Sequence, residues 1–142
     1  MNDITIQLAD WETDHLQLMK VRTRVFIEEQ NVPEELEIDG LDAHSFHIKA
    51  LLPDQKIIAT ARLLTNNYIG RMCVLKAYRN QGTGGKMLQF LIDFAYQLEL
   101  APLQLNAQLS ALAFYQSYGF VKDSEVFLEA GIDHVHMSLI LS

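Results

Sequence analysis

The sequence is poor in cysteine and in long apolar runs. Cys73 is the single cysteine among 142 residues, so no disulfide can form within the chain. A lone cysteine fits a reducing compartment, and we expect a cytoplasmic protein. No apolar run approaches the roughly 18 residues that a bilayer-spanning helix needs. The first residues have neither the basic segment nor the apolar core of a signal peptide, so we expect no membrane partner.

The sequence also lacks a basic patch, and its charge is unevenly placed. Residues 28–42, "EEQNVPEELEIDGLD", contain seven acids and no Lys or Arg, and the other 11 acidic residues balance the 11 basic ones. This segment therefore carries the whole net charge of -7. It is either a solvated acidic loop or an electronegative rim that attracts a cationic amine. Both interpretations argue against a nucleic-acid partner.

Hydrophobic periodicity predicts a single domain over residues 1–142 that mixes strands and helices. Strands are predicted at residues 4–9, 44–52, 56–64, 68–75, 103–106, 120–128 and 133–141. Helices are predicted at residues 14–27, after the glycines at 82–85, and up to Gly119, with Asp14 or Thr13 capping the first. The order β-α-β-β-β-α-β-α-β-β predicts an α/β (α+β) fold. Its sheet has an antiparallel N-terminal meander and then a parallel crossover through the glycine helix.

The stretch "YRNQGTGGKML" has the composition of a phosphate-binding loop. It fails as a Walker A loop, because Asn80 replaces the first glycine and Met87 follows the lysine. It fails as a dinucleotide fingerprint, because Met87 stands where the third glycine belongs. It fits [Q/R]-x-x-G-x-[G/A] from Arg79 to Gly84, between a strand and a helix whose free N–H groups would bind an anion. The alternative is a plain tight turn at a helix start.

Three segments together resemble the GNAT superfamily of acyl-CoA N-acyltransferases, and within it the ElaA-like branch. "RMCVLKAYRNQGTGGKML" is similar to the superfamily's strand, coenzyme A loop and helix, and "LNAQLSALAFYQSYGF" to its next strand and helix. The pair "RTRVFIEEQNVPEELEIDGLD" and "FLEAGIDHVHM" resembles the ElaA-like branch. The resemblance implies a mostly antiparallel sheet of about seven strands, splayed between the fourth and fifth.

The resemblance also implies a site for acetyl-CoA. Backbone N–H groups of the glycine loop would bind the pyrophosphate, and the strand before it would pair with the pantetheine arm. Tyr115 would protonate the departing thiolate; the alternative is a core aromatic on an amphipathic helix. The residues so assigned to the coenzyme are Met72, Cys73, Val74, Arg79, Gln81, Gly82, Thr83, Gly84, Gly85, Lys86, Gln108 and Tyr115.

The sequence departs from the family pattern at the general base. Many members carry a Glu near the start of this strand, but "TNNYIGRMCVL" contains no acid. Candidates elsewhere are Glu28, Glu29, Asp39, His44 and the pair His134 and His136. A histidine suits proton removal near neutral pH, and we assign catalysis to His134; a structural histidine or half of a metal site are the alternatives, and we expect no metal.

The acceptor is expected to be a small-molecule or peptide amine that attacks the thioester directly. Arg24, Glu28, Glu29, Asp39 and His44 are assigned to its binding. For Arg22 and Arg24, solvated helix charges or pairing with the acidic segment are alternatives to a pocket role. Two other functions stay open: an acyl-CoA sensor without activity, motivated by the missing acid, and a plain scaffold. The C-terminal strands could also pair across a homodimer.

Overall fold

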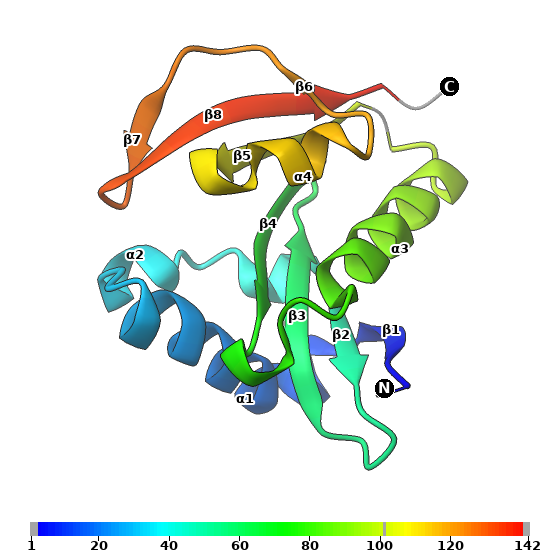
Figure 1. The fold of residues 1–142 in the computed structure, drawn as a ribbon. Helices are drawn as coiled ribbons and strands as arrows, with labels where there is room; N and C mark the ends of the chain where they lie inside the picture. Colours follow the sequence, from blue (N-terminus) through cyan, green and yellow to red (C-terminus); the bar gives the residue numbers. More distant parts are fainter. Residues whose placement is uncertain (1–2, 101, 141–142) are drawn as a thin grey trace.

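The chain folds around one mixed sheet, shown in Figure 1. The structure is a computed structural model that describes residues 3–100 and 102–140. Its strands are β1 (Thr5–Ala9), β2 (Phe46–Leu51), β3 (Ile57–Leu63), β4 (Tyr68–Val74), β5 (Leu103–Gln108), β6 (Val121–Lys122), β7 (Phe127–Glu129) and β8 (Ile132–Leu139). They lie in the order β1-β2-β3-β4-β5-β8-β6, with β7 also on β8. Among them β4 and β5 are the parallel pair, so the predicted mixed, mostly antiparallel sheet is confirmed.

Helices cover both faces of this sheet (Figure 1). They are α1 (Trp11–Arg22), continued by π-helical turns over Thr23–Glu29, then α2 (Glu34–Glu37), α3 (Thr83–Gln97) and α4 (Leu112–Gln116). Successive strand residues point to opposite faces. In β4, Cys73 packs against Val21 and Val25 on the α1 side. Its neighbour Met72 packs into the main core, which contains Met87 of α3. Helices α1 and α3 therefore lie on opposite faces.

The first helix begins earlier than the sequence suggested. Asp10 is its N-cap, because a side-chain oxygen of Asp10 accepts a hydrogen bond from the backbone N–H of Glu12 at 3.1 Å. The expected caps, Asp14 and Thr13, were wrong. Asp14 is instead buried one turn into the helix, where its Oδ2 lies 2.9 Å from Nζ of Lys49.

The strand predicted at 120–128 is two strands, which raises the number in the sheet from the expected seven to eight. Its middle keeps one backbone hydrogen bond, from the Asp123 N–H to the His136 carbonyl oxygen at 3.0 Å, and is otherwise held by side chains. The Ser124 hydroxyl accepts a hydrogen bond from the His136 N–H at 2.8 Å, and the Ser138 hydroxyl donates to Asp123 at 2.9 Å. Both halves pair with β8. Residue 141, the predicted end of the last strand, lies outside the described residues.

Strands β4 and β5 separate soon after they meet, as the resemblance implied (Figure 1). Two pairs join them, Tyr68 with Gln104 and Ile69 with Leu105. Beyond these pairs β4 also carries a bulge toward β3, where the register shifts between the pairs Arg62–Gly70 and Thr60–Cys73. Arg71 within the bulge has φ of +52°, a left-handed conformation that is uncommon for a residue with a side chain. The bulge thus redirects Arg71 at the point where the sheet opens.

Membrane insertion through a helix finds no support in the described part of the chain. None of its helices combines the length and the apolar character that a bilayer crossing requires.

Candidate active site

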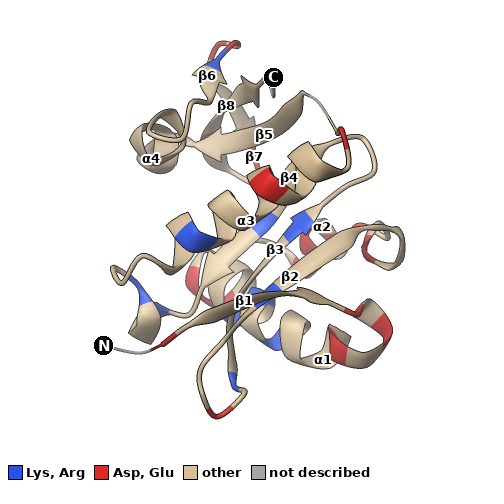
Figure 2. Ribbon diagram, turned by 90° about the vertical axis from the view of Figure 1, so that its right-hand side faces the viewer, with Lys and Arg blue, Asp and Glu red and all other residues tan. Residues whose placement is uncertain are grey.

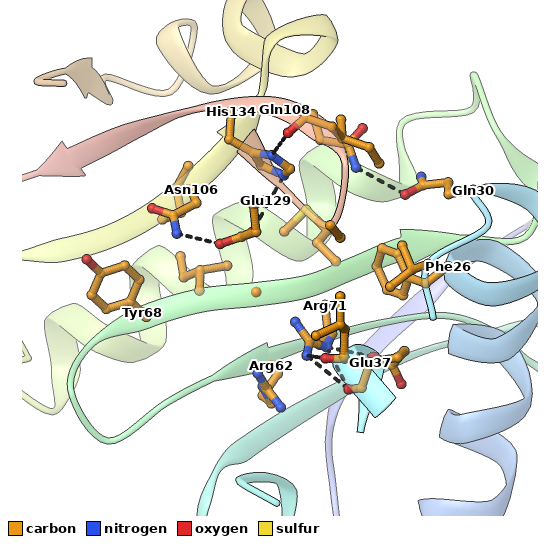
Figure 3. A pocket seen from close by; sticks show the side chains of 18 of the residues that line it. Phe26, Gln30, Glu37, Arg62, Tyr68, Arg71, Asn106, Gln108, Glu129 and His134 are labelled. Atoms are coloured by element: carbon orange, nitrogen blue, oxygen red, sulfur yellow. Dashed lines mark hydrogen bonds and ion pairs between the residues drawn. The ribbon is translucent and has the colours of Figure 1, made fainter. Parts of the chain in front are cut away.

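A cavity of about 530 Å³ lies where β5 leaves β4 (Figure 3). One wall comes from Gly70, Arg71 and Met72 of β4, and the opposite wall from Asn106 and Gln108 of β5. The turns after α1, the segment around α2 and the β7–β8 hairpin complete the lining. Segments from both halves of the chain thus meet around one opening in the sheet.

One wall of the cavity is backed by three arginines and three carboxylates. The members of this charge network are Arg22, Glu37, Asp39, Asp42, Arg62 and Arg71. Arg22 lies 2.9 Å from Glu37 and 2.8 Å from Asp42, measured between guanidinium nitrogen and carboxylate oxygen. Arg71 Nε lies 2.6 Å from Oε2 of Glu37. Equal numbers of opposite charges leave this network without net charge.

The network changes the interpretation of the acidic segment at residues 28–42. Glu37 and Asp42 are buried against arginines, so the segment is not simply a solvated loop or an electronegative rim. Figure 2 shows basic and acidic positions side by side near α2. The solvated explanation for Arg22 is also wrong, because its side chain is 1% exposed. The alternative of pairing with the acidic segment is confirmed for Arg22.

Asp39 is a carboxylate of this network whose pKa is strongly lowered. Burial by itself raises the pKa, but hydrogen bonds from Arg62 and from the Leu41 N–H overcome it and lower the pKa of Asp39 to about 2. A carboxylate of such low pKa is a weak base, so it is poorly suited to take a proton from an ammonium group.

The lowered pKa of Asp39 predicts a pH-dependent stability. Since the folded pKa lies below the unfolded one, the contribution of Asp39 is present above about pH 4 and is lost as pH falls toward 2. Asp39→Asn should lower the free energy of unfolding at pH 7 by about 1–2 kcal/mol, allowing for partial exposure. Urea unfolding between pH 6 and 2 should then show a shallower decline for the variant, and parallel curves would contradict the assignment.

Tyr115 of α4 points into the cavity from the side of the main core. Its hydroxyl oxygen lies 3.9 Å from the sulfur of Met72, and its ring packs edge-on against Phe114 and Phe120. Burial raises the pKa of Tyr115 to about 12. The phenol is protonated at neutral pH, as an unperturbed tyrosine would be, and the raised pKa makes it a weaker acid, so it can donate a proton only as negative charge develops on a nearby acceptor.

His134 lies in the cavity wall on β8 and is nearly buried. Its Nδ1 is 2.7 Å from the carbonyl oxygen of Ile132, and its Nε2 is 3.6 Å from Oε2 of Glu129 (Figure 3). The other candidate, His136, is held outside the lining by Asp123 and by Gln104, whose Oε1 is 3.2 Å from Nε2. Within residues 3–100 and 102–140, no three His, Cys, Asp or Glu side chains are grouped to hold a metal ion.

The glycine loop places free donors at the start of α3. Gly82 has φ of +82°, a conformation that suits glycine, and no side chain caps the helix after it. The N–H groups of the first turn therefore have no partner within the helix. The buried hydroxyl of Thr83 also lacks a hydrogen-bond partner among the described residues. These unpaired donors fit a pyrophosphate.

Close packing explains a further glycine of this loop. A Cβ at Gly85 would lie well inside van der Waals contact with the hydroxyl of Tyr118. Helix α4 and the turn after it can thus rest directly on the start of α3, which joins the loop to the Tyr115 element.

Other residues assigned to the coenzyme lie around this loop in different settings. The guanidinium of Arg79 pairs with Glu29 at 2.5 Å and donates from Nε to the carbonyl oxygen of Val74 at 2.8 Å. Cys73 faces α1, where burial raises the pKa of its thiol to about 12. Gln81 and Lys86 are exposed beside the loop. Their roles toward the coenzyme stay predictions.

The residues assigned to the acceptor are not all brought together. Asp39 lines the cavity, whereas Glu29 is engaged with Arg79. Arg24 and Glu28 form a loose exposed pair at 3.9 Å, and His44 is exposed on the turn before β2. Gln108 does line the cavity, and its Nε2 donates to Oε1 of Gln30 at 3.1 Å across one end of it.

Sequence reasoning missed several polar cavity residues, among them Glu37, Arg62, Arg71, Asn106 and Glu129. The buried charge network behind this wall did leave a pattern in the sequence. Arg22 falls between Leu18 and Val25 on the apolar stripe of the first helix. A charged residue in such a stripe predicts a buried partner of opposite charge. Glu129 left no such pattern in the sequence, because it reaches the cavity only when the β7–β8 hairpin has folded.

The diverging strands, the glycine loop and the Tyr115 helix are the combination that the sequence predicted for an N-acyltransferase. Residues 10–141 match the family model described as the acetyltransferase (GNAT) domain. The chain belongs to the GNAT family of acetyltransferases.

Relatives in the family extend over most of the chain. The uncharacterized N-acetyltransferase YjcF of Bacillus subtilis is 38% identical over 82% of this chain and 86% of its own length. The protein ElaA of Escherichia coli is 32% identical over 85% of this chain and 84% of its own. The resemblance to the ElaA-like branch is thereby confirmed.

Solved structures agree with this assignment. An acyl-CoA N-acyltransferase from Pseudomonas aeruginosa has a TM-score of 0.85 at 33% identity, covering 98% of this chain and 99% of that one. The crystal structure of Escherichia coli ElaA has a TM-score of 0.86 at 29% identity, covering 95% and 99%.

Proposed function

We propose that this protein transfers an acyl group, most simply acetyl, from acyl-CoA to a primary amine by direct attack. The observation that carries the proposal is the cavity between β4 and β5, with Tyr115 in its wall and the uncapped start of α3 nearby. Acyl-CoA supplies the acyl carbon as an activated thioester and a thiol leaving group. The N–H groups after Gly82 suit its pyrophosphate.

The remaining steps, which are binding the acyl oxygen and moving two protons, would be carried out by groups on the two walls of the cavity. The edge of β4 that faces β5 has no strand partner after Ile69 in the described residues, so its main chain is free to pair with an extended ligand. Its N–H groups can stabilise negative charge on the acyl oxygen. Tyr115 gives a proton to the departing sulfur, and His134 is positioned to take one from the amine.

The test is release of free thiol from acetyl-CoA over a panel of primary amines, alongside calorimetry with CoA. We expect CoA binding and amine-dependent thiol release. Binding without release for any amine would favour the alternative of an acyl-CoA sensor. Absence of CoA binding would overturn the proposal altogether.

A further inference from the structure

Three carboxylates line the cavity, and two of them are already paired with arginines. Arg22 contacts both carboxylate oxygens of Glu37, and Arg71 contacts one of them, Oε2. Asp39 contacts Arg62 at 2.8 Å and Arg71 at 3.2 Å. These two carboxylates have little remaining attraction for a further cation.

Glu129 differs from both, because no Lys or Arg of the described residues pairs with it. Its side chain is 51% exposed at the hairpin turn and lines the cavity opposite the charge network (Figure 3). Nδ2 of Asn106 donates to its Oε1 at 3.1 Å, which orients the carboxylate and leaves Oε2 toward His134. Glu129 is therefore the carboxylate of this cavity that can receive a cation.

The hydrogen bond at Nδ1 determines which nitrogen of His134 carries the proton. The Ile132 carbonyl oxygen, 2.7 Å from Nδ1, can only accept, so Nδ1 is the nitrogen that carries the proton when the ring is neutral. Nε2 then carries a lone pair, and it lies 3.6 Å from Oε2 of Glu129. In the neutral ring, Nε2 and Oε2 are thus two hydrogen-bond acceptors that face each other at the cavity.

Such a pair is satisfied by a group that brings both positive charge and several N–H donors. We propose that Glu129 and His134 form the binding site for the primary ammonium group of the acceptor. This proposal rests on the proposed acyltransferase function. An alkylammonium has three donors, so it can contact Oε2 and Nε2 together. A neutral amine gains less from the carboxylate, and the site therefore selects cationic primary amines.

The same contacts provide a balanced route for the proton. The ammonium N–H bound to Nε2 passes its proton to His134, which becomes an imidazolium beside the Glu129 carboxylate. The electron pair left on nitrogen forms the bond to the acyl carbon while the carbon–sulfur bond breaks. The second nitrogen proton is released as the amide forms, and the sulfur receives a proton from Tyr115. The proton held by His134 is then lost to solvent while the Tyr115 phenolate takes one up from solvent, which restores both side chains. The sum is amide, free thiol and one proton released.

A first experiment compares a cationic with an uncharged acceptor in the full chain. Glu129→Gln preserves shape and removes the charge, so kcat/KM for butylamine should fall roughly tenfold, mainly through KM. The value for hydroxylamine, uncharged at neutral pH, should be nearly unchanged. Glu125→Gln, an exposed carboxylate outside the lining, is the matched control and should leave both values unchanged. Equal losses for both acceptors would overturn the proposal.

A second measurement tests the site without turnover and separates it from the acyltransferase proposal. Long-range ¹H–¹⁵N spectra should show His134 protonated at Nδ1, and butylammonium added to the CoA-saturated protein should shift its Nε2 resonance. The shift should require about tenfold more butylammonium in Glu129→Gln. An Nε2-protonated ring, or no shift in the parent, would refute the site. A shift without thiol release from either acceptor would instead refute the acyltransferase function.

Discussion

Tyr115→Phe is expected to lower kcat by about 10²–10⁴-fold while leaving the affinity for CoA nearly unchanged. The phenol of Tyr115 lines the cavity and is protonated at neutral pH, and burial raises its pKa to about 12, so it donates only to a strongly basic atom such as a departing thiolate. The one hydrogen-bond partner of its hydroxyl among the described residues is the sulfur of Met72, at 3.9 Å. The variant therefore loses no strong hydrogen bond, and its ring keeps the packing against Phe114 and Phe120.

The matched control is Tyr96→Phe, an exposed tyrosine on α3 outside the cavity lining. It should leave kcat unchanged. CoA affinity by calorimetry and kcat by thiol release would be measured on both variants. Equal turnover by Tyr115→Phe and the parent would remove Tyr115 from proton transfer and leave it as a core aromatic.

Arg22→Ala is expected to cause the largest loss of stability, about 3–5 kcal/mol in the free energy of unfolding. Arg22 is enclosed by Glu37 and Asp42, and its removal leaves buried negative charge without its partner. Its guanidinium also lies 6.0 Å from the centre of the Trp11 ring, so the loss includes packing.

Arg24→Ala provides the control two residues further along the same helical segment. Its side chain is 73% exposed and its contact with Glu28 is 3.9 Å, so the expected change is within about 0.5 kcal/mol. Arg22→Lys keeps the charge but cannot reproduce the forked contacts, and it should fall between the two. Urea unfolding compares all three variants. Equal losses for positions 22 and 24 would contradict the role of the charge network.

The charge network has a consequence for the chemistry of the cavity. It holds Arg71 in its bulge and neutralises Glu37 and Asp39, so this wall offers no free base. Under the proposed function, Glu129 and His134, which the β7–β8 hairpin places on the opposite wall, would take the role of the acid missing from β4.

Much of the fold could be predicted from local sequence. Alternating and helical periodicities located most elements, because burial of one face imposes those periods. The glycine loop was recognisable because its backbone conformations and close contacts require glycine, as at Gly82. The errors were local: Asp10 caps the first helix in place of Asp14, and a Ser124 hydroxyl replaces a ladder bond where the predicted strand divides.

The sequence by itself indicated most of the elements in their order, the family, and a glycine-rich loop at a helix start, since each appears as a pattern of residues close together in the chain. Only the tertiary structure decided which charges face one another. Asp42 accepts hydrogen bonds from both Arg22 and Arg62, and Glu129 accepts one from Asn106. The partners in each pair are 20 or more positions apart in the sequence. Charge pairing depends on distances of a few ångströms and on burial, and neither is encoded in spacing along the chain. The separation of a neutralised wall from the free Glu129–His134 pair is therefore a property of the folded protein.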